Sequence, residues 1–147
     1  PIDNTIWLAF EYYNQVYIID TAGQVLDSVA IKTADFRLPQ PPVSRLKSNA
    51  VFQDWLSKCT PVRSFNYVAP NRFVLQYETG LEKSGLGSRQ FYATVLWTAD
   101  RNEVVLDVDE TWRLVGVHPD GRVVFVQDRL EENKPRTAVI YIARIEP

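Results

Sequence analysis

The stretch Trp112–Asp128, W-R-L-V-G-V-H-P-D-G-R-V-V-F-V-Q-D, reads as two strands joined by a tight turn. The pair Asp120-Gly121 predicts that turn, because glycine takes a positive φ without steric cost. A second copy of the pattern, V-R-S-F-N-Y-V-A-P-N-R-F-V-L-Q-Y, runs over Val62–Tyr77, and Arg63 in it matches Arg113 (113 − 63 = 50). A period of about 50 residues built from short strands predicts a repeat architecture.

Composition limits the classes of protein to which the chain can belong. Its 147 residues are 46% hydrophobic and 12% aromatic, which is typical of a folded domain with a hydrophobic core. The formal net charge is −2, with acids and bases interspersed, so there is no electrostatic basis for binding nucleic acid or an anionic membrane. No apolar run approaches the roughly 18 residues of a membrane-spanning helix. Since the chain begins at Pro1 and has no Met, we expect it to be a segment of a longer protein.

Further strands are predicted on both sides of the two copies. The first part of the chain predicts a three-stranded meander over Thr5–Glu11, Val16–Asp20 and Val25–Ile31. After the first copy, we expect the Gly/Ser-rich stretch Glu78–Gln90 to be a flexible hairpin loop. Three more strands are then expected, at Phe91–Thr98, Glu103–Val108 and Thr137–Ile145.

Residues 32–61 interrupt this series of strands. Leu38–Pro42 must be extended, because proline fixes its own φ and restrains the residue before it. A short helix is predicted from about Ala50 to Lys58, with Ser48 or Asn49 as its cap. Its apolar residues fall on one helical face: Val51, Phe52, Trp55, Leu56 and Cys59. We expect this insertion to lie as a cap over the ends of the strands.

Strands that follow one another without a long crossover helix are expected to pair antiparallel. Successive connections of a meander alternate between the two ends of the sheets. The tight turns then fall at one end, and the longer connections at the other: the insertion 32–61, Glu78–Gln90 and Arg129–Arg136. Binding loops usually gather at one end of a rigid scaffold, so the long-loop end is the expected binding end.

Four strands in each repeat of about 50 residues predict the blades of a β-propeller. The chain resembles the six-bladed β-propeller proteins of Bacteroidetes, which are related to the NHL and TolB-like propellers. Three stretches carry the resemblance: I-W-L-A-F-E-Y-Y-N-Q-V-Y-I-I-D-T-A-G (Ile6–Gly23), F-Q-D-W-L-S-K-C-T-P-V-R-S-F (Phe52–Phe65) and T-W-R-L-V-G-V-H-P-D-G-R-V-V-F-V (Thr111–Val126).

The resemblance implies an all-β fold of antiparallel four-stranded blades, with one short helix inserted. The chain departs from this family in size, because it has fewer than three blades and a closed ring needs about 4–8. We therefore expect the C-terminal half of a propeller, formed by a single domain over residues 1–147. Val62–Val108 would be one complete blade. The family is usually extracytoplasmic and often lipid-anchored, which implies a periplasmic or cell-surface location, and it offers no catalytic motif to transfer. The alternative fold is a closed up-and-down β-barrel of the lipocalin type, which fits the length and the meander order.

Arg63 and Arg113 are the main candidates for ligand binding. They hold matching places at the start of the innermost strand of their blades, where a guanidinium group is suited to bind a carboxylate, a phosphate or the edge of a carbohydrate. Trp112 and Tyr77 are the neighbouring candidates for stacking against a ligand. The structural alternative is that each arginine pairs with an acid of the neighbouring blade.

Other chemically active residue types have simpler explanations. His118 is the only histidine and lies in a predicted tight turn, where solvent exposure is expected. Cys59 is the only cysteine, which excludes an internal disulfide, and its place on an apolar helix face is typical of a buried residue. Four acids are expected near the long-loop end without the spacing of a metal site: Glu11, Asp107, Asp109 and Glu110. No catalytic residue, metal site or cofactor is therefore predicted.

Three functions fit this sequence. The first is a non-catalytic scaffold that binds a small ligand or a protein at its long-loop end. The second is a propeller hydrolase or lyase whose catalytic residues lie largely in blades outside this chain. The third is a structural segment that needs the missing half of the propeller, or that associates with itself through open sheet edges. A barrel would instead bind a small molecule in its interior.

Overall fold

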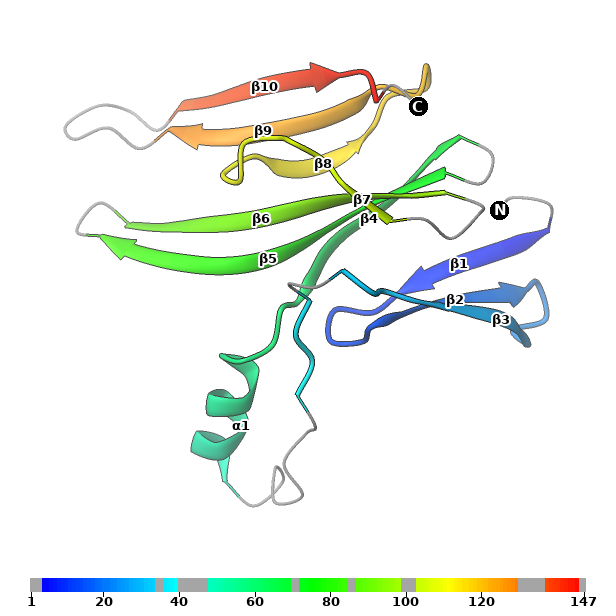
Figure 1. Ribbon diagram of the computed structural model, residues 1–147, viewed down its shortest axis with the longest axis horizontal. Helices are drawn as coiled ribbons and strands as arrows, with labels where there is room; N and C mark the ends of the chain where they lie inside the picture. Colours follow the sequence, from blue (N-terminus) through cyan, green and yellow to red (C-terminus); the bar gives the residue numbers. More distant parts are fainter. Residues whose placement is uncertain are drawn as a thin grey trace. The chain divides into compact units, whose positions relative to one another are not determined.

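The computed structural model describes residues 4–33, 36–39, 48–69, 72–84, 87–98, 103–129 and 137–145 (Figure 1). The chain divides into two compact units, Pro1–Pro61 and Val62–Pro147. The predicted turns at 69–71 and 99–102, and the loop at 129–136, fall largely outside the described residues.

The first unit contains the three-stranded meander that the sequence predicts. Sheet A has the antiparallel order β1-β2-β3, with strands β1 (Thr5–Ala9), β2 (Gln15–Asp20) and β3 (Val25–Ala30). Gly23 takes a φ of 84° in the turn between β2 and β3. The carboxylate of Asp20 closes this turn, because its Oδ1 accepts hydrogen bonds from the backbone N–H of Ala22 at 2.9 Å and of Gln24 at 2.8 Å.

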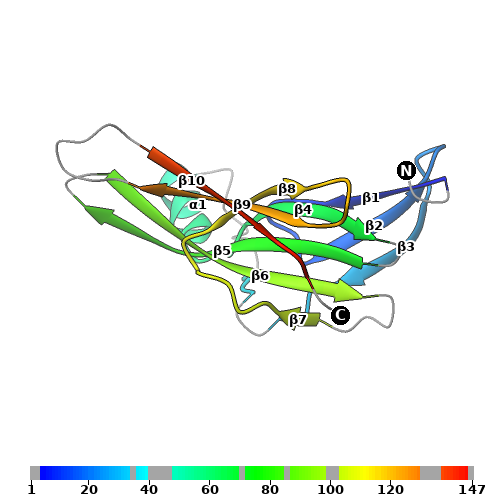
Figure 2. The same cartoon turned by 90° about the horizontal axis from the view of Figure 1, so that it is seen from above.

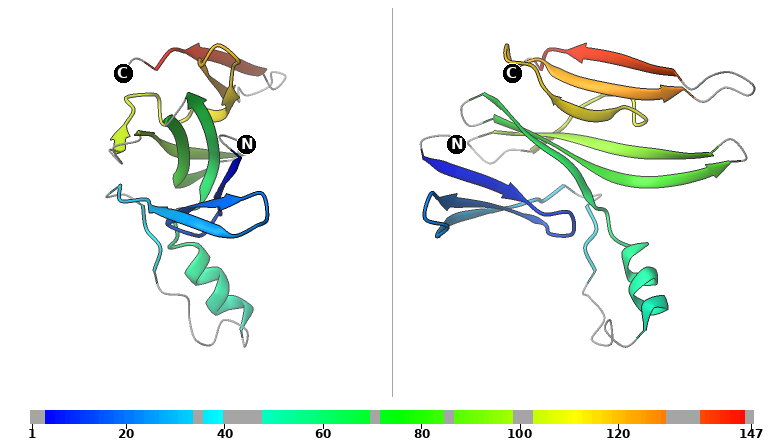
Figure 3. Two further views of the ribbon diagram at one scale, coloured as in Figure 1. Left: turned by 90° about the vertical axis from the view of Figure 1, so that its right-hand side faces the viewer. Right: turned by 180° about the vertical axis from the view of Figure 1, so that it is seen from behind.

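The predicted helix is α1 (Asn49–Leu56), which follows sheet A within the same unit (Figure 3). Ser48 takes the N-cap position with extended backbone angles, but its side chain makes no capping hydrogen bond. Two residues connect the helical segment to the extended stretch before it. Nε1 of Trp55 donates to the carbonyl of Pro39 at 2.9 Å, and the buried Thr60 hydroxyl donates to the carbonyl of Arg37 at 3.0 Å.

The second unit contains two antiparallel sheets. Sheet B has the order β4-β5-β6-β7, with β4 (Val62–Ala69), β5 (Arg72–Ser84), β6 (Gly87–Thr98) and β7 (Glu103–Val105). Sheet C has the order β10-β9-β8, with β8 (Arg113–Val117), β9 (Val123–Arg129) and β10 (Thr137–Ala143). The two sequence copies form the hairpins β4–β5 and β8–β9, which confirms the predicted repeat of strand pairs.

Glu78–Gln90 forms a hairpin, as predicted, but it is not the flexible loop that its glycines suggested. Strands β5 and β6 continue through this stretch as a long hairpin, paired from Glu78↔Tyr92 to Ser84↔Gly87. Figure 2 shows the two strands running together past the part of β5 that pairs with β4, whose register begins at Val62↔Tyr77. A β-bulge between Glu78 and Gly80 shifts the register of the two strands by one residue, and their pairing then continues to the end of the hairpin.

The core of the second unit lies between sheets B and C. Its fully buried members come from β5, β8 and β9: Val74, Leu114, Val123 and Phe125. Because side chains alternate along a strand, Val74 and Gln76 point from sheet B toward sheet C, while Phe73 and Tyr77 point to the opposite face. Sheet B is thus buried on both faces, with exposed fractions of 0% for Gln76 and 1% for Phe73.

This architecture confirms the predicted fold class, an all-β and partial propeller-like arrangement of antiparallel sheets with one short helix. The alternative of a closed barrel is wrong, because the strands of the described residues form three separate sheets that do not close on themselves. In the described part of the chain, no helix has the length and apolar character needed to cross a membrane.

Candidate functional site

Arg63 is held by an acid on the adjacent strand of its own sheet. Oε2 of Glu78 accepts from Nε of Arg63 at 2.9 Å and lies 2.8 Å from its Nη2. The same oxygen also accepts a hydrogen bond from Nε2 of Gln90 at 3.0 Å. A carboxylate that receives several donors fixes the guanidinium in place, so Arg63 serves the structure of sheet B. The sequence analysis had offered an acid of the neighbouring blade as the alternative partner of Arg63. That alternative is wrong, because Glu78 lies on β5 of the same sheet.

Tyr92 extends this network into the interior. Its hydroxyl donates to Oε1 of Gln90 at 2.8 Å, and its ring is almost fully buried. Burial raises the pKa of the Tyr92 phenol. The positive charges of Arg113 and Arg63 lower this pKa, and the negative charge of Glu78 raises it. The two repeat-equivalent arginines therefore both act on one tyrosine, which places the starts of β4 and β8 at a shared polar site.

Arg113 differs from its repeat partner, because its side chain is exposed and makes no hydrogen bond or ion pair with any described residue. In the second copy of the repeat, Asp128 holds the position that Glu78 holds in the first copy (128 − 78 = 50). Asp128 makes an interaction of its own, and Arg113 forms no ion pair with a described residue. The second copy thus leaves a cationic group open to solvent where the first copy neutralises it.

The two predicted stacking residues do not offer free aromatic faces. Tyr77 has an exposed fraction of 0%, so no ligand can lie against its ring in this structure. Trp112 stacks on Tyr141 with ring centroids 3.8 Å apart and contacts Phe125 at 6.0 Å. Of the four candidate binding residues, Arg113 is the one whose charged group faces solvent without an ion-pair partner among the described residues.

His118 lies in the exposed turn between β8 and β9, as predicted. Its Nδ1 is 2.8 Å from Oδ1 of Asp120, whose other carboxylate oxygen accepts from Nε of Arg122 at 2.7 Å. Hydrogen bonding to Arg122 holds the pKa of Asp120 well below its usual range. These contacts shape the turn around Gly121, which has a φ of 83°.

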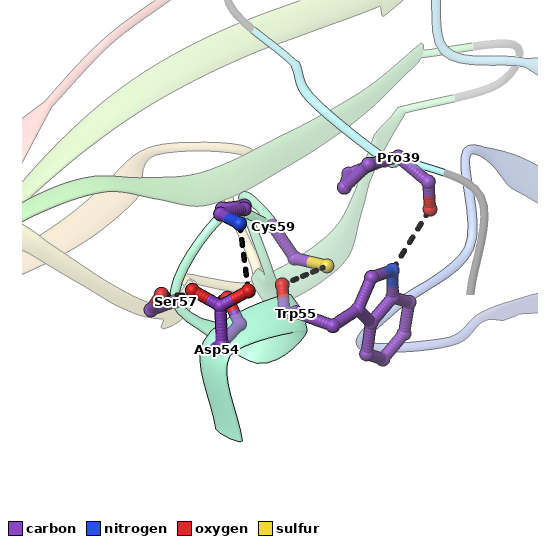
Figure 4. Close-up of polar contacts among 6 residues, drawn as sticks. Pro39, Asp54, Trp55, Ser57 and Cys59 are labelled. Atoms are coloured by element: carbon purple, nitrogen blue, oxygen red, sulfur yellow. Dashed lines mark hydrogen bonds and ion pairs between the residues drawn. The ribbon is translucent and has the colours of Figure 1, made fainter. Parts of the chain in front are cut away.

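Cys59 lies beyond the end of α1 and is buried, as predicted (Figure 4). Its Sγ contacts the carbonyl oxygen of Trp55 at 3.4 Å, and burial raises the pKa of the thiol. A nucleophilic cysteine requires a lowered pKa, so this environment favours the thiol form. Around it, Asp54 accepts from Nζ of Lys58 at 2.7 Å, and its carbonyl accepts from the hydroxyl of Ser57.

A second polar network, which the sequence analysis missed, precedes β8. Oδ1 of Asp109 accepts from the Thr111 hydroxyl at 2.6 Å and from the Thr111 backbone N–H at 2.8 Å, and these bonds lower the pKa of Asp109. The Thr111 hydroxyl accepts from Nε2 of Gln127 at 2.8 Å, and Oε1 of Gln127 accepts from Tyr141 at 3.1 Å. Asp109 therefore orders the entry to β8.

Within the described residues, no three His, Cys, Asp or Glu side chains gather in an arrangement suited to a metal ion. A comparison of the chain with protein-family models, with curated proteins and with solved structures gives no significant match.

Proposed function

We propose that the chain is a non-catalytic, extracytoplasmic binding scaffold of the six-bladed β-propeller type, and that Arg113 contacts an anionic group of its ligand. The observation that carries this proposal is the contrast between two equivalent arginines. Arg63 is neutralised by Glu78 at 2.8 Å, while Arg113 is exposed and has no ion pair with a described residue.

The chemistry of the site favours a carboxylate or a phosphate. A guanidinium offers several N–H donors in one plane, which matches the oxygens of either group. Arg63 and Glu78 lie in the neighbouring sheet as a closed ion pair, so they do not compete for the incoming anion. The half-buried Gln90 and the buried Tyr92 hold this pair in place.

Calorimetric titration of the chain with succinate and with inorganic phosphate tests this proposal. We expect weak binding of at least one probe, and we expect Arg113→Gln to abolish it. Arg122→Gln is the matched control, because its guanidinium is exposed but engaged by Asp120 at 2.7 Å. Undiminished binding by Arg113→Gln, or no binding of either probe by the original chain, would contradict the assignment.

A further inference from the structure

Sheet C buries one face against sheet B and leaves the other open. Because paired and alternating residues share a face, Val124, Val126, Ile140 and Ile142 form one surface, here called the outer face of sheet C. Ile140 is 65% exposed and Ile142 is 52% exposed, which is unusual for two isoleucines at neighbouring positions of one sheet. Contiguous exposed apolar side chains mark an interaction surface.

The internal repeat indicates what kind of structure covers this face. In sheet B the pairs Val74↔Leu96 and Gln76↔Thr94 hold the places that Val124↔Ile142 and Val126↔Ile140 hold in sheet C (74 + 50 = 124; 76 + 50 = 126).

Val74 packs against sheet C and Gln76 is hydrogen-bonded to it, and all four residues of sheet B are at most 5% exposed. The packing of one sheet on the next is thus already present once in the molecule, and its continuation would bury the outer face of sheet C.

The chain carries a matching apolar face of its own. In sheet A, Ile6, Ile19 and Val25 lie in one row across the three strands, with Leu8 and Tyr17 in the next row. Ile6 is 39% exposed and Val25 is 62% exposed, whereas Val16 and Val29 on the opposite face are buried.

Two further aromatic residues enlarge this open face of sheet A. Phe10 contacts Tyr17 and Tyr13 edge to face, with ring centroids 6.0 and 5.8 Å apart, and Phe10 is 48% exposed. The surface thus mixes aliphatic and aromatic side chains, as does the surface that sheet C presents to sheet B through Leu114, Val123 and Phe125.

We propose that the outer face of sheet C docks onto the open face of sheet A in a second copy of this chain. The contact is heterologous, because two different faces meet, and it repeats the way in which sheet C covers sheet B. Association of this kind closes into a ring where the rotation allows and otherwise continues into an open assembly.

The proposed anion site borders this docking surface, because Arg113 pairs with Val126 on the outer face of sheet C. Arg63 keeps 34% of its side chain exposed although sheet C covers the neighbouring Val74 and Gln76. Arg113 holds the equivalent place in sheet C, so a covering sheet leaves it a similar exposure. The two proposals are tested by different variants, Ile140→Lys and Ile6→Lys for association and Arg113→Gln for anion binding, so either can fail experimentally without the other.

Light scattering coupled to size-exclusion chromatography, over a series of concentrations, measures the association of the full chain. We expect the original chain to form a dimer or a larger assembly. Ile140→Lys on sheet C and Ile6→Lys on sheet A should each weaken self-association by about 30-fold or more, as for a central interface residue. Val105→Lys is the control, because Val105 is 55% exposed on β7 and lies outside both faces.

Mixing the two variants tests the heterologous geometry. Ile140→Lys keeps its sheet A face and Ile6→Lys keeps its sheet C face, so an equimolar mixture should form a heterodimer that neither variant forms alone. Thermal melting of each variant shows whether its fold is retained.

Three results would overturn the proposal. They are a chain that stays monomeric at every concentration, association that the two variants leave unchanged, and an Ile6→Lys variant that self-associates as strongly as the original chain. If the chain stayed monomeric, the outer face of sheet C would have to be covered by another partner or by a further part of a longer chain.

Discussion

The backbone N–H of Leu114 on β8 donates to Oε1 of Gln76 on β5 at 2.7 Å, across 38 positions of sequence. Nε2 of the same glutamine donates to the carbonyl of Trp112 at 2.8 Å and to the hydroxyl of Thr94 at 3.0 Å. A fully buried side chain of sheet B thus fixes the first strand of sheet C, and it aligns the two sheets as well as holding them together.

Replacing Gln76 with leucine should destabilise the second unit by about 2–3 kcal/mol. The shape of the side chain is nearly kept, but the buried N–H of Leu114 and the carbonyl of Trp112 lose their partners, and such groups cost about 1–3 kcal/mol when they are left unpaired. Chemical denaturation measures the loss. Gln53→Leu on the exposed surface of α1 is the control and should change little; equal effects of the two substitutions would refute the role of Gln76.

Substitution of Thr60 should destabilise the first unit nearly as much as substitution of Gln76 destabilises the second. Its hydroxyl donates to the carbonyl of Arg37 at 3.0 Å and accepts from the Arg37 backbone N–H, and it is only 1% exposed. Thr60→Val keeps the shape and removes both bonds, so we expect a loss of about 1–3 kcal/mol. Ser57→Ala, at an exposed position of the same segment, should cost less than Thr60→Val. If Thr60→Val left the free energy of unfolding unchanged, the hydrogen bonds between Thr60 and Arg37 would contribute nothing to stability.

Replacing a glycine that has a positive φ in a hairpin turn should lower the free energy of unfolding. Gly121 has a φ of 83°, and an added Cβ would lie 3.6 Å from the carbonyl oxygen of Val68, which is ordinary contact. The cost of Gly121→Ala is therefore conformational, about 1–2 kcal/mol. Gly116→Ala is a matched control, since Gly116 has neither a positive φ nor a close neighbour. Denaturation midpoints of the two variants should differ accordingly, and identical midpoints would contradict this explanation.

Asp120 should stay ionised at unusually low pH. Its pKa is lowered first by the hydrogen bond from the Arg122 side chain. A depressed pKa in the folded state contributes stability that is present above the unfolded-state value of about 3.9 and is lost as the pH falls through the folded value. Carbon-13 NMR titration of the Asp120 carboxyl in the original chain and in Arg122→Gln measures the shift. The variant should titrate closer to 3.9; an unchanged curve would rule out Arg122 as the cause.

The 50-residue repeat predicted the hairpins β4–β5 and β8–β9 because the alternation of side chains and the turn residues are local properties. The extension of β5 to Ser84 escaped prediction, since glycines favour turns locally and pairing with β6 outweighs that preference. The role of Gln76 escaped as well, because its partners lie in another sheet and no local pattern marks a buried amide.

The candidate site was predicted in part. The matching positions of Arg63 and Arg113 follow from the repeat, but the repeat does not show that Glu78 pairs with Arg63 while Arg113 has no ion pair with a described residue. The sequence places an acid at the equivalent position of each copy, Glu78 and Asp128, which are 50 residues apart (128 − 78 = 50). The burial of Tyr77 was not visible, because it depends on the second covered face of sheet B.

The Arg113 side chain offers the most direct measurement of the proposed binding function. Nitrogen-15 NMR of arginine Nε–Hε groups, recorded while succinate or inorganic phosphate is added, should show a saturable shift of the Arg113 signal. The Arg63 signal should move less, since Glu78 already accepts from its Nε at 2.9 Å. An Arg113 signal that does not move with either anion, or that moves no more than the signal of Arg63, would contradict the assignment of Arg113 as the anion-binding group.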